Sequence, residues 1–300
     1  MIDFIRRLFR QPSEEKLAPL SDVQTAPLSE DQLEVTSIPT INWTPPQLLV
    51  GCAQSVGMQR DHNEDSMFTM TAEVADGHSS LPFGLFMVAD GMGGHSHGDI
   101  ASQTATRALS EYLIRKIYLP MLDYDPDIQN ESLQEVLEAG IKHAHQAVVQ
   151  RAPGGGTTMT AALVLSEQVT IAHVGDSRAY FIYPDGRSQT LTQDHSLVHR
   201  LIELGQLTEA EALVHPQRNV VYRALGQAEP FHPDIKTLLL PHPGYLMICS
   251  DGLWGVVPED VVCNTILSAS RLSEACHQLV ELANKNGGPD NISVILVQYL

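Results

Sequence analysis

The chain has 300 residues, of which 43% are hydrophobic, and its 36 acidic and 18 basic residues give a formal net charge of −18 at pH 7. This composition excludes a wholly disordered chain, and the negative field excludes nucleic acid and anionic membranes as expected partners. The sequence contains neither an apolar stretch long enough to span a membrane nor the apolar core of a secretory signal. We therefore expect no transmembrane segment and a cytoplasmic location.

Residues 1–47 are predicted to form a flexible leader. Prolines recur among polar and acidic residues from Gln11 to Pro46, without a sustained apolar period. Ahead of them, apolar and basic residues at helical spacing over 2–10 predict a short amphipathic turn. We favour a frayed end over a docking or membrane-surface element, because so short a helix is marginal alone.

Residues 48–300 are predicted to form one domain of strands punctuated by glycines and helices. The order of strand runs and helix pairs indicates an α+β fold. Two helices begin with Ser/Thr-x-x-Glu capping boxes, at Ser132 and Thr208. The helix that begins at Ser132 is predicted to run to residue 150, and further helices are predicted over 98–118, over 196–204, after Pro258 and over 273–284. Strands over 158–165, 169–174 and 179–183, with a turn at 184–186, are predicted to form an antiparallel meander. The segment 292–300 is predicted to be a buried strand.

The four cysteines form no CxxC pair and no zinc-ligand spacing with histidine, which predicts reduced and buried thiols. They are Cys52, Cys249, Cys263 and Cys276.

Acidic residues recur in one sequence context, at the end of an apolar run or beside a glycine turn. An ionised carboxylate next to buried strands is costly unless it is paired or binds a metal, and several that converge need a cation. A single Asp-Gly is most simply a turn, but the repetition favours a site. The segments are Asn63-Glu64-Asp65, Ala89-Asp90-Gly91, Gly175-Asp176-Ser177, Ser250-Asp251-Gly252 and Pro289-Asp290-Asn291.

Oxygen ligands without cysteine select hard ions, so Mg²⁺ or Mn²⁺ is expected at these carboxylates. Two such ions can activate a shared water and stabilise both the attacking and the leaving oxygen of a phosphate ester, which predicts a hydrolase. The glycines of Gly91-Met92-Gly93 and of 154–156 do not form nucleotide sites by themselves. The first motif lacks its third glycine, and the second lacks the lysine of a P-loop.

With these residues in view, the sequence resembles the metal-dependent protein serine/threonine phosphatases, the PPM or type-2C family, and its bacterial members in particular. The resemblance covers 48–300 and implies a four-layer αββα sandwich, in which two antiparallel sheets are flanked by helix pairs. The motifs that carry it, in the family's order, are Arg60-x-x-Asn63-Glu64-Asp65, Val88-Ala89-Asp90-Gly91-Met92-Gly93-Gly94-His95, Gly156-Thr157-Thr158, Val174-Gly175-Asp176-Ser177-Arg178, Thr192-x-Asp194-His195-Ser196, Arg223-Ala224-Leu225-Gly226, Cys249-Ser250-Asp251-Gly252 and Asp290-Asn291.

The resemblance implies two catalytic ions, Mn²⁺ or Mg²⁺, and a third, weaker one. Asp90 is expected to bridge the two catalytic ions. The Gly91 carbonyl and Glu64 are expected to serve the second, and Asp65 to hold a coordinated water.

On the same grounds, Asp251 and Asp290 are expected to bind the first ion. The third ion is expected between Asp176 and Asp251.

Two further residues are implied in catalysis. Arg60 matches the arginine that holds the substrate phosphate, for which a bidentate guanidinium is well suited. His95 is the candidate general acid, because Met92 occupies the position where eukaryotic members carry a histidine. The segment 194–222 corresponds to a mobile flap of the bacterial relatives. Gly205, Gly226 and the stretch around His215-Pro216 are equally compatible with hinges and with ordinary turns.

The expected function is hydrolysis of phosphoserine and phosphothreonine in proteins, by attack of a water that bridges the two ions and without a covalent intermediate. The expected partners are phosphoproteins made by a Ser/Thr kinase in bacterial signal transduction, and we expect a monomer. Two alternatives stay open at this point. One is a regulatory module that has lost its chemistry, and the other is a two-metal nuclease or small phosphomonoesterase, which the acidic charge disfavours.

Overall fold

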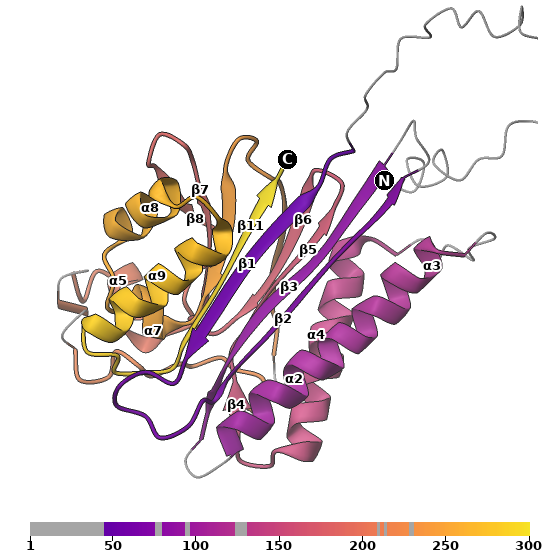
Figure 1. Ribbon diagram of the computed structural model, residues 1–300. Coiled ribbons are helices and arrows are strands. Elements are labelled where there is room, and N and C mark those ends of the chain that lie inside the picture. The colour runs from indigo at the N-terminus through magenta and orange to yellow at the C-terminus, as the bar shows by residue number, and fades with distance from the viewer. Residues whose placement is uncertain are drawn as a thin grey trace, which may run out of the picture.

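The computed structural model describes residues 45–75, 80–93, 97–123, 131–208, 211–212, 215–227 and 231–300 (Figure 1). Residues 1–44, which hold most of the predicted leader and its amphipathic start, lie outside this range. Gln47 already belongs to the fold, because its backbone N–H donates to the Leu300 carbonyl and its carbonyl accepts from the Leu300 N–H.

Two antiparallel sheets form the centre of the molecule. The first sheet contains, in spatial order, β1 (Leu48–Ser55), β11 (Ile292–Tyr299), β10 (Tyr245–Cys249), β7 (Arg178–Ile182) and β8 (Ser188–Thr190). The second contains β2 (Asp65–Ala75), β3 (Ser80–Met92), β5 (Met159–Leu165), β6 (Gln168–Val174) and β9 (Asp234–Leu239), and the short β4 (Gly156–Thr157) pairs with the end of β3.

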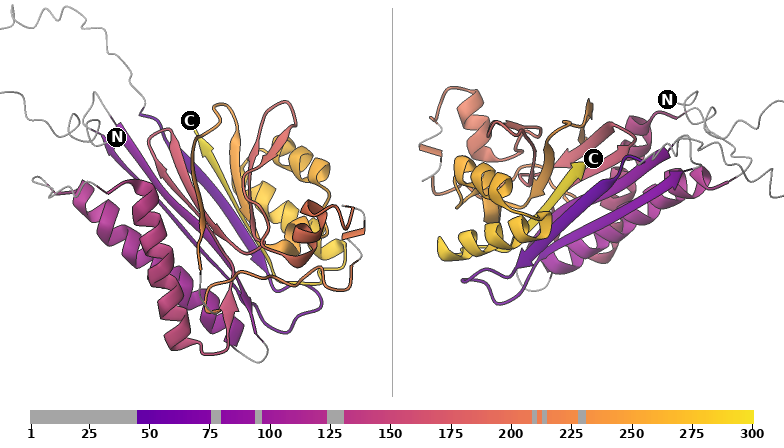
Figure 2. Two further views of the ribbon diagram at one scale, coloured as in Figure 1. Left: turned by 180° about the vertical axis from the view of Figure 1, so that it is seen from behind. Right: turned by 45° about the horizontal axis from the view of Figure 1, so that its top comes forward.

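Helices cover the outer faces of both sheets, as the views in Figures 1 and 2 show. The second sheet carries α2 (His97–Leu113), which continues through the π-helical turn η2 (Ile114–Tyr118) into α3 (Leu119–Met121), and the antiparallel α4 (Leu133–Arg151). The first sheet carries α7 (Asp251–Trp254), α8 (Glu259–Ser268) and α9 (Leu272–Lys285), while α5 (Leu197–Glu203) lies in the connection between the sheets.

Three apolar clusters hold the layers together. One lies between the two sheets and includes Phe86 and Ile295, both fully buried. The second lies between β3, β5 and the α2–α4 pair, and the third lies between the first sheet and α8 and α9. Since hydrophobic burial is the main driving force of folding, this layering accounts for the unbroken apolar runs of β3, β5 and β11. The predicted αββα sandwich is confirmed.

The predicted helices are confirmed where the structure describes them, and their caps form as expected. Ser132 and Glu135 make both bonds of the capping box that begins α4. Thr208 and Glu211 make the same reciprocal bonds, although several residues after Thr208 lie outside the described ranges. All four cysteines are free, three of them buried and Cys52 half-buried.

The predicted meander is wrong in one respect, because its third strand belongs to the other sheet. The strands β5 and β6 pair with each other, but β7 pairs with β10 and β8. The chain crosses between the sheets at Gly175, whose φ of +108° suits glycine. Both β6 and β7 are buried on both faces, so their side-chain pattern does not reveal which sheet each joins.

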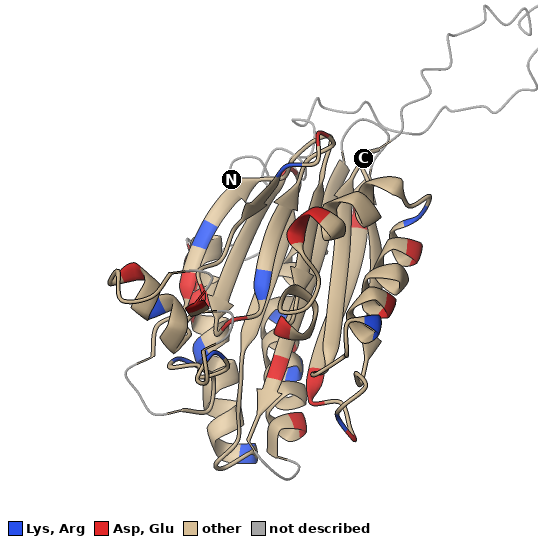
Figure 3. Cartoon of the chain, turned by 90° about the vertical axis from the view of Figure 1, so that its left-hand side faces the viewer, with Lys and Arg blue, Asp and Glu red and all other residues tan. Residues whose placement is uncertain are grey.

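In the part of the chain that the structure describes, every helix is too short or too polar to cross a membrane. Acidic positions are distributed over several helices and strands of the face drawn in Figure 3, with basic positions between them.

Candidate metal centre

The centre is built on the neighbouring strands β2 and β3, which place Asp65 directly opposite Asp90. The backbone of Asp90 is held by the β4 segment. Its N–H donates to Thr158 Oγ1 at 2.9 Å, and its carbonyl accepts from Thr157 Oγ1 at 2.9 Å and from the Thr158 N–H at 2.8 Å. These bonds fix the strand end from which the Asp90 side chain projects.

Asp251 reaches the same place from the first sheet, as the first residue of α7 after β10. Its carboxyl lies close enough to that of Asp90 to affect its own pKa. Two hydroxyls of the first sheet, Ser250 Oγ at 2.8 Å and Ser293 Oγ at 2.7 Å, donate to Asp65 Oδ2. The two sheets therefore meet through carboxylates and hydroxyls at this end of the sandwich.

Burial and mutual repulsion raise the pKa values of these carboxyls. Burial raises the pKa of Asp65 to about 7, against the opposing effect of its two serine donors, and raises the pKa of Asp251 to about 6. The pKa of Asp90 lies well above its usual range through burial and the nearby charges of Asp65 and Asp251. Burial and the charge of Asp251 likewise raise the pKa of Asp176. Four carboxyls that disfavour each other's ionisation would be relieved by a cation.

The donor set fits a hard divalent ion. Asp65 Oδ1 and Asp251 Oδ1 are buried, and neither has a hydrogen-bond partner among the described residues. Such atoms are rare in folded proteins unless an ion or water satisfies them. No three acidic, histidine or cysteine side chains within the described ranges already surround a common point as a ligand set. The carboxylates are thus gathered, but they do not form a preassembled cage.

Glu64 and Gly91 are brought together by the start of α2. The Gly91 N–H donates to the Glu64 carbonyl at 3.2 Å, and Ser102 Oγ donates to the same carbonyl at 2.5 Å. A Cβ on Gly91 would stand 2.2 Å from the Gly98 carbonyl oxygen, and one on Gly98 would stand 2.7 Å from Glu64 Oε1. Two glycines are therefore required for α2 to pack against the centre.

Asp290 pairs with Arg60. Arg60 Nη2 donates to Asp290 Oδ2 at 2.7 Å, and the arginine side chain remains 45% exposed. Burial lowers the pKa of Arg60, but the charges of Asp290, Glu64 and Asp90 outweigh this effect and raise it. The guanidinium therefore faces the acidic centre and keeps further N–H groups for another anion.

Asp176 lies in the crossing between the two sheets and contacts α7. Trp254 Nε1 donates to the Asp176 carbonyl at 3.0 Å, and Ser177 Oγ lies 2.8 Å from Thr158 Oγ1. Together with the charge of Asp251, which raises the pKa of Asp176, these contacts place Asp176 beside the other carboxylates.

His195 binds the backbone of Gly175, where the chain crosses from one sheet to the other. Its ring Nδ1 accepts from the Gly175 N–H at 3.1 Å, and the backbone N–H of His195 donates to the Gly175 carbonyl at 2.7 Å. Its Nε2 lies 2.9 Å from Arg223 Nη1 and 3.2 Å from Asp234 Oδ2. Burial and the charge of Arg223 lower the pKa of His195, which favours the neutral ring.

The structure therefore brings together all the predicted metal-binding residues and Arg60. His95 lies outside the described residues, and its role stays a prediction. A second histidine, His62, lies with Nε2 3.4 Å from Glu64 Oε1 on an exposed side chain. The segment 194–222 is anchored by His195 and by a bridge between Ser196 and Val221, and its function as a flap stays a prediction.

Sequence reasoning did not assign roles to the residues that hold the ligands in place. Asn291 is the main example. Its Oδ1 accepts from the Glu64 N–H at 2.7 Å, and its Nδ2 donates to the carbonyls of Val56 at 2.8 Å and His62 at 2.9 Å. Its position directly after Asp290 was the available signal. Ser293, two residues further along β11, gave none.

Comparisons with known proteins agree with this geometry. The family described as protein phosphatase 2C matches residues 52–292. The serine/threonine phosphatase stp of Listeria innocua is 37% identical over 81% of this chain and 92% of its own.

Solved structures are similar as well. The Mycobacterium tuberculosis serine/threonine phosphatase PstP/Ppp superposes with a TM-score of 0.69 and 29% identity, over 84% of this chain and 98% of its own. The catalytic domain of PstP in complex with two manganese ions superposes with a TM-score of 0.67 and 28% identity, over the same shares of the two chains.

Proposed function

This chain belongs to the protein phosphatase 2C family and is a serine/threonine phosphatase, and from that premise we propose that its acidic centre hydrolyses phosphoserine and phosphothreonine in proteins with two Mn²⁺ or Mg²⁺ ions. The observation that carries the proposal is the convergence of mutually repelling carboxylates from both sheets. Two of their oxygens, Asp65 Oδ1 and Asp251 Oδ1, are buried without a hydrogen-bond partner among the described residues. The two manganese ions of the similar PstP structure support it.

The residues that would hold the ions all provide oxygen. Asp90 is central, because it contacts Asp251 and lies opposite Asp65. Two divalent ions at such a centre lower the pKa of a water between them and stabilise charge on the attacking and leaving oxygens. The proposed ligands are Glu64, Asp65, Asp90, the Gly91 carbonyl, Asp251 and Asp290, with Asp176 and Asp251 for a third, weaker ion.

We assign substrate binding to Arg60. Its guanidinium lies at the edge of the centre and is half-exposed, so a phosphate can reach it. A phosphate group would share its N–H donors with Asp290, in the planar geometry that suits phosphate oxygens. Arg60→Lys keeps the positive charge but loses the planar pair of N–H donors of the guanidinium. This variant should raise KM more than it lowers kcat.

We assign protonation of the leaving oxygen to His95. A histidine titrates in the range useful for this step. His62 provides the matched control, because it lies near Glu64 but is exposed. His95→Gln should lower kcat by about 10²-fold or more, the usual contribution of a general acid, and His62→Gln should leave kcat within a factor of about two. Equal losses in both variants would contradict the assignment.

We further propose that the substrates are phosphoproteins made by a Ser/Thr kinase in cytoplasmic signalling, and that the chain acts as a monomer. Sedimentation of the purified protein at assay concentration tests the last point.

The experiment that tests the function measures phosphate release from phosphothreonine and phosphotyrosine peptides of one sequence, with Mn²⁺, with Mg²⁺ and with EDTA. We expect release from phosphothreonine only with metal, and much slower release from phosphotyrosine. In water enriched in ¹⁸O, single-turnover phosphate should carry one solvent oxygen without a preceding burst of alcohol product, because water attacks phosphorus directly. Release that persists in EDTA, or a burst, would contradict the proposal.

A further inference from the structure

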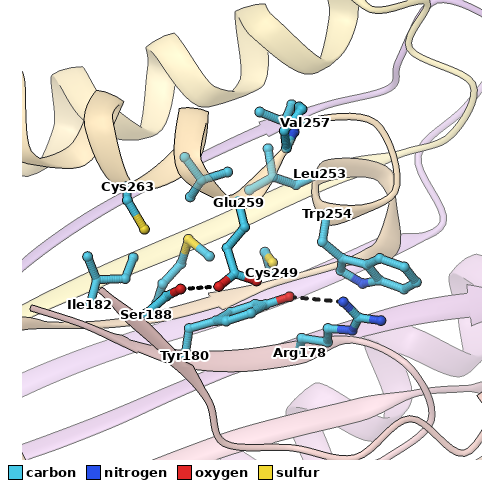
Figure 4. Close-up of a pocket in the computed structure, with 13 residues that line it drawn as sticks. Arg178, Tyr180, Ile182, Ser188, Cys249, Leu253, Trp254, Val257, Glu259 and Cys263 are labelled. Atoms are coloured by element: carbon cyan, nitrogen blue, oxygen red, sulfur yellow. Dashed lines mark hydrogen bonds between the residues drawn. The ribbon is translucent and has the colours of Figure 1, made fainter. Parts of the chain in front are cut away.

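A cavity lies between the outer face of the first sheet and helix α8, away from the substrate-facing Arg60. Its volume is about 100 Å³, and β7, β10, α7 and α8 form its walls (Figure 4). Apolar side chains such as Ile182, Met247, Leu253 and Val262 line most of it. Arg178, Tyr180, Ser188 and Glu259 are among its polar lining residues.

The cavity connects with the surface. A shallower depression of about 490 Å³ shares Ser188, Glu259 and Cys263 with it. Ser188 Oγ donates to Glu259 Oε1, and this contact spans from β8 to the first turn of α8 (Figure 4). The half-buried Ser188 and the exposed Glu259 therefore stand where a small molecule would pass from solvent into the cavity.

One buried donor in the cavity wall has no acceptor. The Tyr180 side chain is only 3% exposed, and its hydroxyl oxygen accepts from Arg178 Nη1 at 3.2 Å. Within the described ranges, no acceptor is found for the proton of that hydroxyl. A buried donor without an acceptor is unfavourable, so a ligand oxygen that accepts this proton would be stabilised here.

The same wall is joined to the metal centre. Leu253 and Trp254 belong to α7, the helix that begins with Asp251. The Arg178 guanidinium lies 3.6 Å from the centre of the Trp254 ring, and Trp254 Nε1 donates to the Asp176 carbonyl. A molecule in the cavity would thus pack against α7, which carries Asp251, and against Trp254, whose ring N–H binds the backbone carbonyl of Asp176.

We propose that this cavity binds a small uncharged ring with one hydroxyl, of which phenol is the simplest member, and that the occupied cavity tightens divalent-ion binding between Asp176 and Asp251. The second half rests on the proposed function. An apolar cavity of about 150 Å³ holds benzene, so this smaller cavity with an open side takes no more than one such ring. The hydroxyl oxygen accepts from Tyr180, and its proton is available to the Glu259 carboxylate.

Binding is tested on the full chain in Mg²⁺ by ligand-observed NMR, with phenol and with toluene, which replaces the hydroxyl by a methyl group. We expect phenol to bind at millimolar concentration and toluene more weakly. Tyr180→Phe removes the donor and should abolish the preference for phenol. Cys263→Leu adds bulk to the wall and should abolish binding of both, with circular dichroism as the check on folding. Absence of phenol binding, or unchanged binding in Cys263→Leu, overturns the inference.

Coupling is tested by calorimetric titration of Mn²⁺ with and without saturating phenol. We expect the weakest Mn²⁺ site to tighten about fivefold, at the lower end of usual coupling between sites, and phenol to bind correspondingly tighter in Mn²⁺. Unchanged affinity in both directions overturns the coupling. An active phosphatase that binds no phenol contradicts only this inference, whereas a protein that binds phenol but releases no phosphate with any metal contradicts only the proposed function.

Discussion

Asp65 shows how the surroundings of one residue set its chemistry. Its Oδ2 is satisfied by two serine hydroxyls, while its Oδ1 is buried without a partner. Burial dominates and raises its pKa to about 7. A carboxyl in this state holds a proton near neutral pH until a cation replaces that proton. Metal binding at the centre should therefore release protons.

The pH dependence of stability follows from the same residue. The folded-state pKa of about 7 lies above the ordinary aspartate value of 3.8, so the folded protein binds a proton that the unfolded chain has released across this window. Stability is therefore highest at the acidic end and falls as pH rises toward 7. In EDTA, the melting temperature should decrease from pH 5 to pH 7.5, and Mn²⁺ should restore it at pH 7.5.

Asp65→Asn is the control for this titration, since it removes the ionisable group and keeps the size. We expect a flatter dependence of melting temperature on pH in this variant, measured by differential scanning fluorimetry in EDTA. A wild-type melting temperature that rises steadily over the same range would contradict the assignment of raised pKa values to the centre.

At the scale of elements, Asn291, directly before β11, makes three of the hydrogen bonds that hold the loop before β2. Asn291 is 4% exposed and bonds to the backbone of Glu64, Val56 and His62. Asn291→Ala leaves these buried groups without partners and should lower the free energy of unfolding by about 1–3 kcal/mol. It should also raise KM, because Arg60 lies in the same loop. Thermal melts and phosphopeptide kinetics measure the two effects.

Asn286→Ala is the matched control for that variant. Its side chain is exposed and donates one hydrogen bond, from Nδ2 to the Val256 carbonyl at 2.8 Å. We expect a loss of stability below about 1 kcal/mol and an unchanged KM. Equal changes in both variants would show that Asn291 does not organise the loop.

The contact between β1 and α9 depends on a glycine. A Cβ on Gly51 would stand 2.4 Å from the Leu272 carbonyl carbon, which belongs to the backbone and cannot rotate away. Gly51→Ala should therefore destabilise the protein by about 1–3 kcal/mol, through overpacking. This contact is remote from the carboxylates, so the folded variant should keep wild-type kcat. Chemical denaturation gives the stability change.

Gly140→Ala on α4 is the control for this packing argument. The nearest atoms to its added Cβ would be side-chain ends of Leu109 at 2.9 Å and Tyr112 at 3.1 Å, which can move. The gain in helix propensity, about 1 kcal/mol, offsets part of the cost. A larger loss at Gly140 than at Gly51 would contradict the distinction between backbone and side-chain contacts.

At the scale of the whole molecule, local signals predicted elements better than their arrangement. The helix after Ser132 carries its cap in its own sequence, so its start could be placed to the residue. The sheet that β7 joins could not be inferred, because β7 is buried on both faces and its partners β8 and β10 are not both near in sequence. Pairing between distant strands leaves no local pattern.

The residues of the site likewise include some that local sequence predicts and others that it does not. The carboxylates were identified because each directly follows or begins an apolar run, which is visible in sequence. The groups that orient them come from distant segments: Ser293 lies 228 positions from Asp65, and Asn291 lies 227 from Glu64. The cavity behind Trp254 likewise depends on packing between β7 and α8, which sequence does not show.

The most direct test of the central claim compares the wild-type protein with Asp90→Asn, in Mn²⁺ and in EDTA. Calorimetry counts the bound ions, and a phosphothreonine peptide reports hydrolysis. The wild type should bind at least two Mn²⁺ ions and release phosphate only with metal. Asp90→Asn should remain folded, lose tight Mn²⁺ binding and lose at least about 10³-fold in kcat, about 4 kcal/mol of transition-state stabilisation. A folded Asp90→Asn protein with wild-type activity in Mn²⁺ would contradict the account.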